Sequence, residues 1–145
     1  MGEYVFDTEP VIAFFYNEEG HEAVADILDD VEAGTVDGTL TEVNASELLY
    51  KIARIEGNGT ATSASLRTAD RDIRTLARRG VSVERADWQL ASEVKVDGNI
   101  SLADAYAVAL AFERDATLLV GGDDDFDTLP IDVDVERFRD HGVYR

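Results

Sequence analysis

Short apolar runs alternate with helical segments along this chain, and this alternation limits the folds open to it more than any other feature. Contiguous apolar residues occur at Val5–Phe6 and at Leu118–Val120, as expected for strands that are buried on both faces of a sheet. Alternating strands and helices form a parallel sheet that is covered by helices. The sequence therefore predicts the α/β class, with an α/β/α sandwich around a central parallel sheet.

The predicted elements follow one another without repeats or a linker, which suggests a single domain over residues 1–145. The predicted strands are 4–7, 36–39, 81–84, 117–121 and 133–138. The predicted helices are 10–17, 21–33, 42–56, 60–79, 88–96 and 102–114. Large aromatic side chains are expected in the core, namely Trp88, Tyr106 and the phenylalanines.

Composition excludes several kinds of chemistry. The chain contains no cysteine, so disulfides, thiolate metal sites and a cysteine nucleophile are excluded. Its two histidines, His21 and His141, have no evident partners, and a zinc site is not expected. No charged and apolar N-terminal leader is visible, and the longest apolar run, 105–112, is far shorter than the roughly 20 residues of a membrane-spanning helix. We therefore expect a soluble, cytoplasmic protein that does not contact a membrane.

Acidic residues outnumber basic ones over the whole length of the chain. There are 31 Asp and Glu residues against 13 Lys and Arg residues, the net charge is −18, and Lys51 and Lys95 are the only lysines. Evenly spread acidity with little lysine suggests adaptation to molar salt, where the Debye length is about 3 Å and self-repulsion is screened. We therefore predict a halophile-like protein. In this background an isolated carboxylate is expected to be solvated surface, so a functional one needs a further argument.

Four acidic residues stand out because each lies at the end of an element or on a helix face. Asp7 ends the first apolar run, Glu47 lies within a helix, Asp104 opens another helix, and Asp123 follows the run TLLVGG. Open parallel sheets bind ligands at the carboxyl ends of their strands, where Asp7 and Asp123 are expected. Gathered carboxylates repel one another, so a fold that collects them usually binds a hard divalent cation there. The four residues are therefore candidate ligands for Mg²⁺ or Mn²⁺.

Asp7 and Asp104 each have a structural alternative. Asp7 stands before a predicted helix with Pro10 in its first turn, and could simply cap that helix. Ser101 and Asp104 are spaced as in a capping box, with Asp where Glu is usual. Taken one at a time, these two residues do not distinguish a helix cap from a metal ligand.

Glu47 and Asp123 have alternatives of a different kind. Glu47 shares a helix face with Asn44, and it could form an i,i+4 ion pair with Lys51. Asp123 and the acids after it could be turn residues of an acidic surface. The spacing G-G-D-x-D-F is more particular, because Phe126 would insert into the core and hold the loop with Asp123 at the sheet edge.

The order and the flanks of these acids resemble one family, the PIN-domain ribonucleases, and most closely the small VapC-type toxins of toxin–antitoxin pairs. The resemblance covers nearly the whole chain and is carried by the segments VFDTEPVIAFF, LTEVNASELLYKI, ISLADAYAVALA and TLLVGGDDDF. It implies one set of catalytic, metal-binding acids: Asp7, Glu47, Asp104 and Asp123. The family's threonine in the last motif is Gly121 here. This departure removes a hydroxyl that would orient the site, and it leaves Asp125 as a substitute for Asp123.

The resemblance and the chemistry of the acids imply the same reaction, hydrolysis of RNA phosphodiesters by a Mg²⁺-dependent endoribonuclease. The bound ion would activate a water for in-line attack, so no covalent nucleophile is needed. Neighbouring polar residues are candidates for supporting the main ligands through hydrogen bonds: Thr8, Asn44, Ser101 and Asp125.

The resemblance to VapC-type toxins also implies partners. These are a second copy of the toxin in a homodimer and a small antitoxin protein that folds over the toxin. The antitoxin is expected to present an arginine or lysine to the acidic pocket. Leu49 and Ile52 on the helix 42–56 could dock an amphipathic antitoxin segment. Alternatively, these two residues face only the core of the chain itself.

Arginines recur at helical spacing within the predicted helix 60–79. A narrow stripe is formed by Arg67, Arg71, Arg74 and Arg78. On a different face lie residues that are expected to pack inward, namely Leu66, Ala69, Ile73, Leu76 and Ala77. A chain of charge −18 repels RNA, so the arginine stripe is a candidate RNA-binding surface. Its structural alternative is a solvated face with ion pairs such as Asp70–Arg74.

Other functions remain open on sequence alone. The chain could be a stand-alone RNA-processing PIN nuclease, or a catalytically silent PIN domain that binds RNA, although the retained acids argue against silence. A phosphatase of the haloacid-dehalogenase type also places an Asp at its first strand end. That class expects a second Asp where Glu9 stands, and a lysine for which only Lys95 is available.

Overall fold

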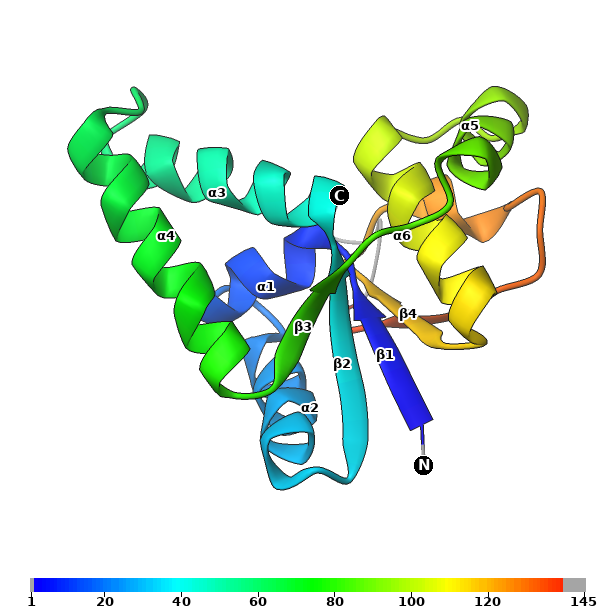
Figure 1. Ribbon diagram of the computed structural model, residues 1–145, viewed down its shortest axis with the longest axis horizontal. Coiled ribbons are helices and arrows are strands. Elements are labelled where there is room, and N and C mark those ends of the chain that lie inside the picture. The colour runs from blue at the N-terminus through cyan, green and yellow to red at the C-terminus, as the bar shows by residue number, and fades with distance from the viewer. Residues whose placement is uncertain (1, 140–145) are drawn as a thin grey trace.

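The computed structural model describes residues 2–139, apart from the side chain of Asp124, so His141 lies outside the described range. Strands and helices alternate along the chain (Figure 1). The strands are β1 (Gly2–Phe6), β2 (Val36–Thr41), β3 (Val81–Glu84), β4 (Thr117–Val120) and β5 (Asp134–Arg137). The helices are α1 (Thr8–Phe15), α2 (His21–Ala33), α3 (Glu42–Glu56), α4 (Ser63–Arg78), α5 (Trp88–Asp97) and α6 (Leu102–Arg114), with a 3-10 turn η1 (Asp124–Asp127) after β4.

The strands form one parallel sheet in the order β3-β2-β1-β4-β5. In its centre β1 pairs with β2 on one side and with β4 on the other, so that Val5 lies between Thr39 and Leu118. The chain runs outward from β1 to β3 and then crosses to β4 on the opposite side. Such a reversal leaves a crevice at the carboxyl ends of the central strands, where parallel sheets bind ligands. The predicted α/β/α sandwich with a central parallel sheet is confirmed.

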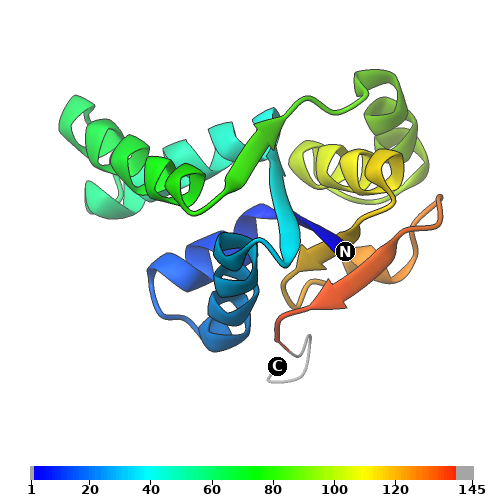
Figure 2. The same ribbon diagram turned by 60° about the horizontal axis from the view of Figure 1, so that its bottom comes forward.

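The sheet is buried on both faces, which explains the contiguous apolar runs. Phe6 and Leu119 pack into one core with residues of α1 to α4. Their neighbours Val5, Leu118 and Val120 point the other way and pack against α5 and α6. Figure 2 shows the same division, with α1 to α4 grouped on one side of the sheet and α5 and α6 on the other.

Most element bounds agree with the prediction, and the differences have local causes. The helix α1 begins at Thr8 instead of residue 10. Pro10 fits in the first turn because the backbone N–H that a proline lacks would have no partner within the helix there. The helix α4 begins at Ser63 instead of residue 60, because Thr62 and Ser65 form a reciprocal capping box. The turn η1 was not predicted. The helix α6 is the most deeply buried helix, and no helix in the described part of the chain is long and apolar enough to cross a membrane.

Several residues predicted to lie in the core are exposed. Trp88 at the start of α5 is 60% exposed and Phe112 on α6 is 47% exposed, so both predictions are wrong, while Tyr106 is half-buried. On α4, Leu66 and Ala77 are also exposed, although Ala69 and Leu76 do pack inward and Ile73 does so in part. In these helices the actual apolar face is narrower than the residue types suggest, because only part of each helix contacts a neighbour.

Candidate active site

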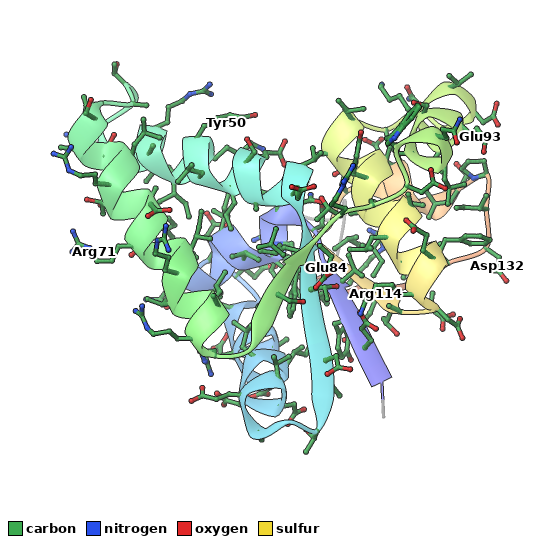
Figure 3. All side chains as sticks on the ribbon, in the orientation of Figure 1. Tyr50, Arg71, Glu84, Glu93, Arg114 and Asp132 are labelled. Carbon is green, nitrogen blue, oxygen red and sulfur yellow. The ribbon has the colours of Figure 1, made fainter. Side chains whose placement is uncertain are left out.

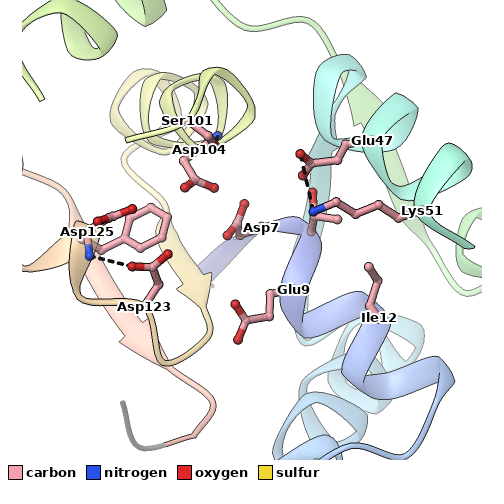
Figure 4. A pocket seen from close by; sticks show the side chains of 11 residues that line it. Asp7, Glu9, Ile12, Glu47, Lys51, Ser101, Asp104, Asp123 and Asp125 are labelled. Atoms are coloured by element: carbon pink, nitrogen blue, oxygen red, sulfur yellow. Dashed lines mark hydrogen bonds and ion pairs between the residues drawn. The ribbon is translucent and has the colours of Figure 1, made fainter. Parts of the chain in front are cut away.

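All four acids singled out in the sequence line one cavity at the carboxyl edge of the sheet (Figure 4). The cavity has a volume of about 330 Å³. Its wall is formed by Asp7, Thr8, Glu9, Ile12, Glu47, Lys51, Ser101, Asp104, Asp123, Asp125 and Phe126. The loop before α1, the helices α3 and α6, and the loop after β4 each contribute at least one acid, so segments far apart in the sequence meet at this point.

Asp7 follows β1 directly and stands at the first position before α1. Its backbone N–H continues the sheet by donating to the carbonyl oxygen of Leu119 at 3.0 Å. Its side chain forms no capping hydrogen bond with α1, so the capping alternative does not account for it. The side chain is buried, with 5% exposure. Burial raises the pKa of Asp7 well above its ordinary value, and the adjacent carboxylate of Asp104 raises it further.

A buried polar network fixes Asp7 from the side of α3. Nδ2 of Asn44 donates to Oδ1 of Asp7 at 3.3 Å and to Oγ1 of Thr8 at 3.1 Å. The hydroxyl of Thr41 donates to Oδ1 of Asn44 at 2.6 Å and accepts from its backbone N–H at 2.9 Å. All four residues are buried, so the orientation of Asp7 is set by packed groups. Asn44 thus contacts the carboxylate of Asp7 and the hydroxyl of Thr8, while Thr41 was missed as a supporting residue.

Asp104 lies in the first turn of α6 and faces Asp7 across the cavity (Figure 4). Ser101 caps this helix, with its hydroxyl accepting from the backbone N–H of Asp104 at 3.1 Å, so the backbone of Asp104 is capped while its carboxylate serves the cavity. Burial raises the pKa of Asp104, and the charges of Glu47 and Asp123 add to this, whereas hydrogen bonds with Asp7 and Ser101 lower it. The carboxylates of Asp7 and Asp104 therefore influence each other's pKa, and burial raises both.

The other two acids are more open. Glu47 on α3 lies 3.7 Å from Nζ of Lys51, the i,i+4 pair that its position suggested. Asp123 is exposed and accepts a hydrogen bond from the backbone N–H of Asp125 at 2.9 Å, as a turn residue would. Carboxylate oxygens of Asp104, Asp123 and Asp125 nevertheless lie within 4.8 Å of one another. Asp104 therefore belongs both to the buried pair with Asp7 and to this open triad.

The chemistry of these side chains suits a hard divalent cation. All the candidate ligands are carboxylate oxygens, the type that Mg²⁺ and Mn²⁺ prefer. Among the residues that the structure describes, no arginine, lysine or histidine forms an ion pair with Asp7, Asp104 or Asp123. Uncompensated buried carboxylates are unfavourable, and a bound cation would remove this cost. The predicted role of Phe126 fits as well, because this residue is buried beneath the loop.

Besides Thr41, three further residues at the site were missed by sequence reasoning as functional candidates. Glu9 lines the cavity two positions after Asp7, and its carboxylate contacts the loop after β4 and Arg139. Arg137 is the last residue of β5 and holds that loop, and Arg139, two positions further on, holds Glu9. Of these residues, only Glu9 had a feature in the sequence that could have indicated a role at the site. It lies in the first turn of the helix that follows Asp7.

The sequence matches the PIN domain over residues 4–131, so the chain belongs to the PIN-domain family. PIN domains are generally nucleases, and they typically use divalent metals. Because the chain belongs to the PIN-domain family, the alternative of a haloacid-dehalogenase phosphatase is dropped. No curated protein sequence matches the chain.

Solved structures with the same fold include toxin–antitoxin complexes. A VapBC2 complex of Rickettsia felis, bound to a DNA fragment from its promoter, is 13% identical with a TM-score of 0.67, and the match covers 93% of this chain and 98% of the other. A toxin–antitoxin complex of Klebsiella pneumoniae is 16% identical with a TM-score of 0.62, covering 94% and 98%. The FitAcB structure of Neisseria gonorrhoeae is 19% identical with a TM-score of 0.58, covering 91% and 95%. At these identities the likeness concerns the fold.

Proposed function

We propose that this chain is a Mg²⁺- or Mn²⁺-dependent endoribonuclease and the toxin of a toxin–antitoxin pair, acting in the cytoplasm as a homodimer of single-domain subunits. The observation that carries the proposal is the gathering of three carboxylates, Asp7, Asp104 and Asp123, around one cavity at the carboxyl edge of the sheet, with Asp7 buried. No described cation is paired with them. Such an arrangement destabilises the fold unless it serves a ligand, and the membership in a family of nucleases supports a catalytic metal.

Asp7, Asp104 and Asp123 would hold the metal, with Glu47 completing the shell directly or through water and Asp125 within reach. When bound, the cation supplies Lewis acidity, which eases deprotonation of an attacking water and stabilises the leaving oxygen. The protein contributes position. Asn44 and Thr41 hold Asp7 in one orientation, and Ser101 fixes the first turn of α6 beneath Asp104.

The proposal is tested by metal binding at several pH values. We expect RNA cleavage with Mg²⁺ or Mn²⁺ and none with a chelator. Because the pKa of Asp7 is raised, the site still holds a proton at pH values where an ordinary aspartate has lost its own, and metal binding must displace this proton. Calorimetric Mn²⁺ affinity should therefore rise with pH by up to about tenfold per unit below the raised pKa, with proton release seen in buffers of different ionisation enthalpy. Cleavage that persists in chelator, or an affinity independent of pH, would contradict the assignment.

The arginine stripe of α4 is the proposed contact for the RNA backbone. Arg67, Arg71, Arg74 and Arg78 are all exposed, and Figure 3 shows Arg71 pointing outward from α4. Arg74 also forms the anticipated pair with Asp70, with Nε 2.7 Å from the carboxylate. Exposed pairs of this kind contribute little to stability. The stripe therefore remains available for phosphate contacts on a chain whose overall charge repels nucleic acid.

The proposed antitoxin would bind near the groove between α3 and α4. This groove has a volume of about 620 Å³ and is lined by Leu49, Leu66, Arg67, Asp70 and Arg71. Leu49 is partly buried, but Ile52 is fully buried in the core, so the expectation that Ile52 lies on an outer face is wrong. An amphipathic segment in the groove would leave its end free to place an arginine among the carboxylates of the cavity.

Co-expression with the product of the gene immediately upstream tests whether this partner exists. We expect a complex that contains two copies of this chain and whose RNA cleavage is suppressed. Leu66→Glu, at an exposed position of the groove, should weaken the complex by roughly tenfold or more. Val96→Glu, at an exposed position of α5, is the matched control and should leave the complex intact. A monomer that binds nothing and does not inhibit growth would favour a stand-alone RNA-processing nuclease.

A further inference from the structure

The space that a side chain at position 121 would need is filled by Glu9. A Cβ atom placed on Gly121 would lie 1.8 Å from Oε2 of Glu9 and 2.1 Å from its carboxyl carbon, far inside van der Waals contact. The third nearest atom, Oε1 at 2.7 Å, belongs to the same carboxylate. Glu9 comes from the first turn of α1, so this carboxylate reaches the loop after β4 from another part of the fold.

The carboxylate of Glu9 is anchored on both sides. Its Oε2 accepts a hydrogen bond from the backbone N–H of Gly122 at 3.4 Å and a charge-assisted one from Nη2 of Arg139 at 2.7 Å. Nη1 of Arg139 also donates to the carbonyl oxygen of Glu19 at 3.2 Å and lies 3.7 Å from the carboxylate of Glu18. The arginine side chain is only 19% exposed, so these contacts restrict its position.

A second arginine holds the same loop directly. We call residues 121–127 the site loop, because it carries Asp123 and Asp125. Nη1 of Arg137 donates to the carbonyl oxygens of Gly121 at 3.1 Å and Asp123 at 2.6 Å, and Nη2 pairs with the carboxylate of Asp127. The backbone of the site loop is thus fastened at its start through Glu9 and along its length by Arg137.

We propose that Glu9 and Gly121 form a matched pair that positions the site loop. The glycine leaves room for the Glu9 carboxylate, and the carboxylate, held by Arg139, fixes the start of the loop and with it Asp123 and Asp125. Glu9 comes from α1 and reaches the loop through the backbone N–H of Gly122. It is a positioning residue for the acids of the cavity. The role in metal binding rests on the proposed function, whereas the pairing is a property of the fold.

A double-mutant cycle on the metal-free protein in molar KCl tests the pairing. Gly121→Ala displaces the Glu9 carboxylate from Gly122 and Arg139, so the melting temperature should fall by roughly 5 °C. In the Glu9→Ala background the same substitution should shift it by less than about 1 °C, because the three nearest obstructing atoms are gone. Equal shifts in both backgrounds, including no shift in either, would overturn the pairing.

Mn²⁺ affinity, measured by calorimetry, tests the positioning role. Glu9→Ala should weaken binding by about tenfold, and Glu9→Gln, which keeps an acceptor oxygen for Gly122, should restore most of it. Glu18→Ala is the matched control, because it removes the same charge beside Arg139 without touching the site loop. Equal losses in Glu9→Ala and Glu18→Ala would show that only charge matters and refute the role. If the wild type neither binds Mn²⁺ nor cuts RNA, the proposed function fails, while the melting cycle still decides the pairing.

Discussion

Replacing Asp104 by asparagine lowers kcat/KM for RNA cleavage by roughly a thousandfold or more, the result expected if a catalytic metal supplies several kcal/mol to the transition state. Asp104 is the one residue shared by the buried pair with Asp7 and by the open triad with Asp123 and Asp125. Asparagine has almost the same shape and leaves the backbone hydrogen bond to Ser101 in place. The loss should therefore come from the missing charge.

Asp7→Asn should abolish cleavage to a similar extent and also raise the melting temperature of the metal-free protein. Asparagine can still accept the hydrogen bond from Asn44, while the cost of a buried charge beside Asp104 disappears. Each kcal/mol gained corresponds to about 4 °C at this chain length. Asp26→Asn on the exposed side of α2 is the control and should change neither activity nor stability. Wild-type cleavage by either variant would show that the site is assigned to the wrong residues.

The sign of this stability effect follows from proton linkage. The folded-state pKa of Asp7 is raised, so over the pH range from the ordinary aspartate pKa up to that raised value the native state binds more protons than the unfolded state. Stability contributed by this group is present at low pH and is lost as pH rises through the window. Asparagine does not ionise, so the Asp7→Asn variant does not lose this stability. The difference in melting temperature between the variant and the wild type should therefore grow with pH.

Transfer from molar KCl to dilute buffer is expected to unfold or strongly destabilise the chain. The net charge is −18, and dilution from about 1 M to 0.1 M salt lengthens the Debye length from about 3 Å to about 10 Å. Carboxylates at the surface then repel one another over the distances that separate them. In every ion pair of the described residues at least one partner is exposed to solvent, so the strengthening of these pairs at low salt offsets little of this repulsion.

We expect a melting temperature at least about 10 °C higher in 2 M than in 0.1 M KCl, measured by circular dichroism. Sucrose at equal osmolality is the control, because it favours compact states without screening charge. A melting temperature that does not change with KCl would rule out salt adaptation as the reason for the acidic composition. Sucrose acting as strongly as KCl would point to solvent exclusion instead of screening.

Features that depend on short sequence spacing could be predicted. The contiguous apolar runs at Val5 and Leu118 specified strands buried on both faces, and the strand ends brought Asp7 and Asp123 to one edge. The position of Asp104 at the start of a helix indicated that it belongs to the site. The helical spacing of Asn44 from Glu47 indicated the same for Asn44. In each case the local pattern and the global fold agree, which is the condition under which sequence reasoning succeeds.

Features that depend on contacts between distant segments could not be predicted. Glu9 and Arg139 are 130 positions apart, and neither has a neighbour in sequence that indicates the other. The lack of a side chain at Gly121 matters only once α1 is packed beside β4 and the carboxylate of Glu9 fills that space. Trp88 and Phe112 show the opposite error, because their residue types favour burial but no other element covers their part of the surface.

The distances in sequence between the groups of the cavity also govern when a newly made chain acquires its chemistry. Asp7 and Asn44 can meet early in translation, but Asp104 and the β4 strand that anchors the backbone of Asp7 emerge much later. The ion pair between Arg139 and Glu9 joins residues that are 130 positions apart. Domains fold as units during synthesis, so a nascent chain on the ribosome carries an incomplete centre for most of its elongation. If the chain is the nuclease proposed above, its centre is completed only late in synthesis.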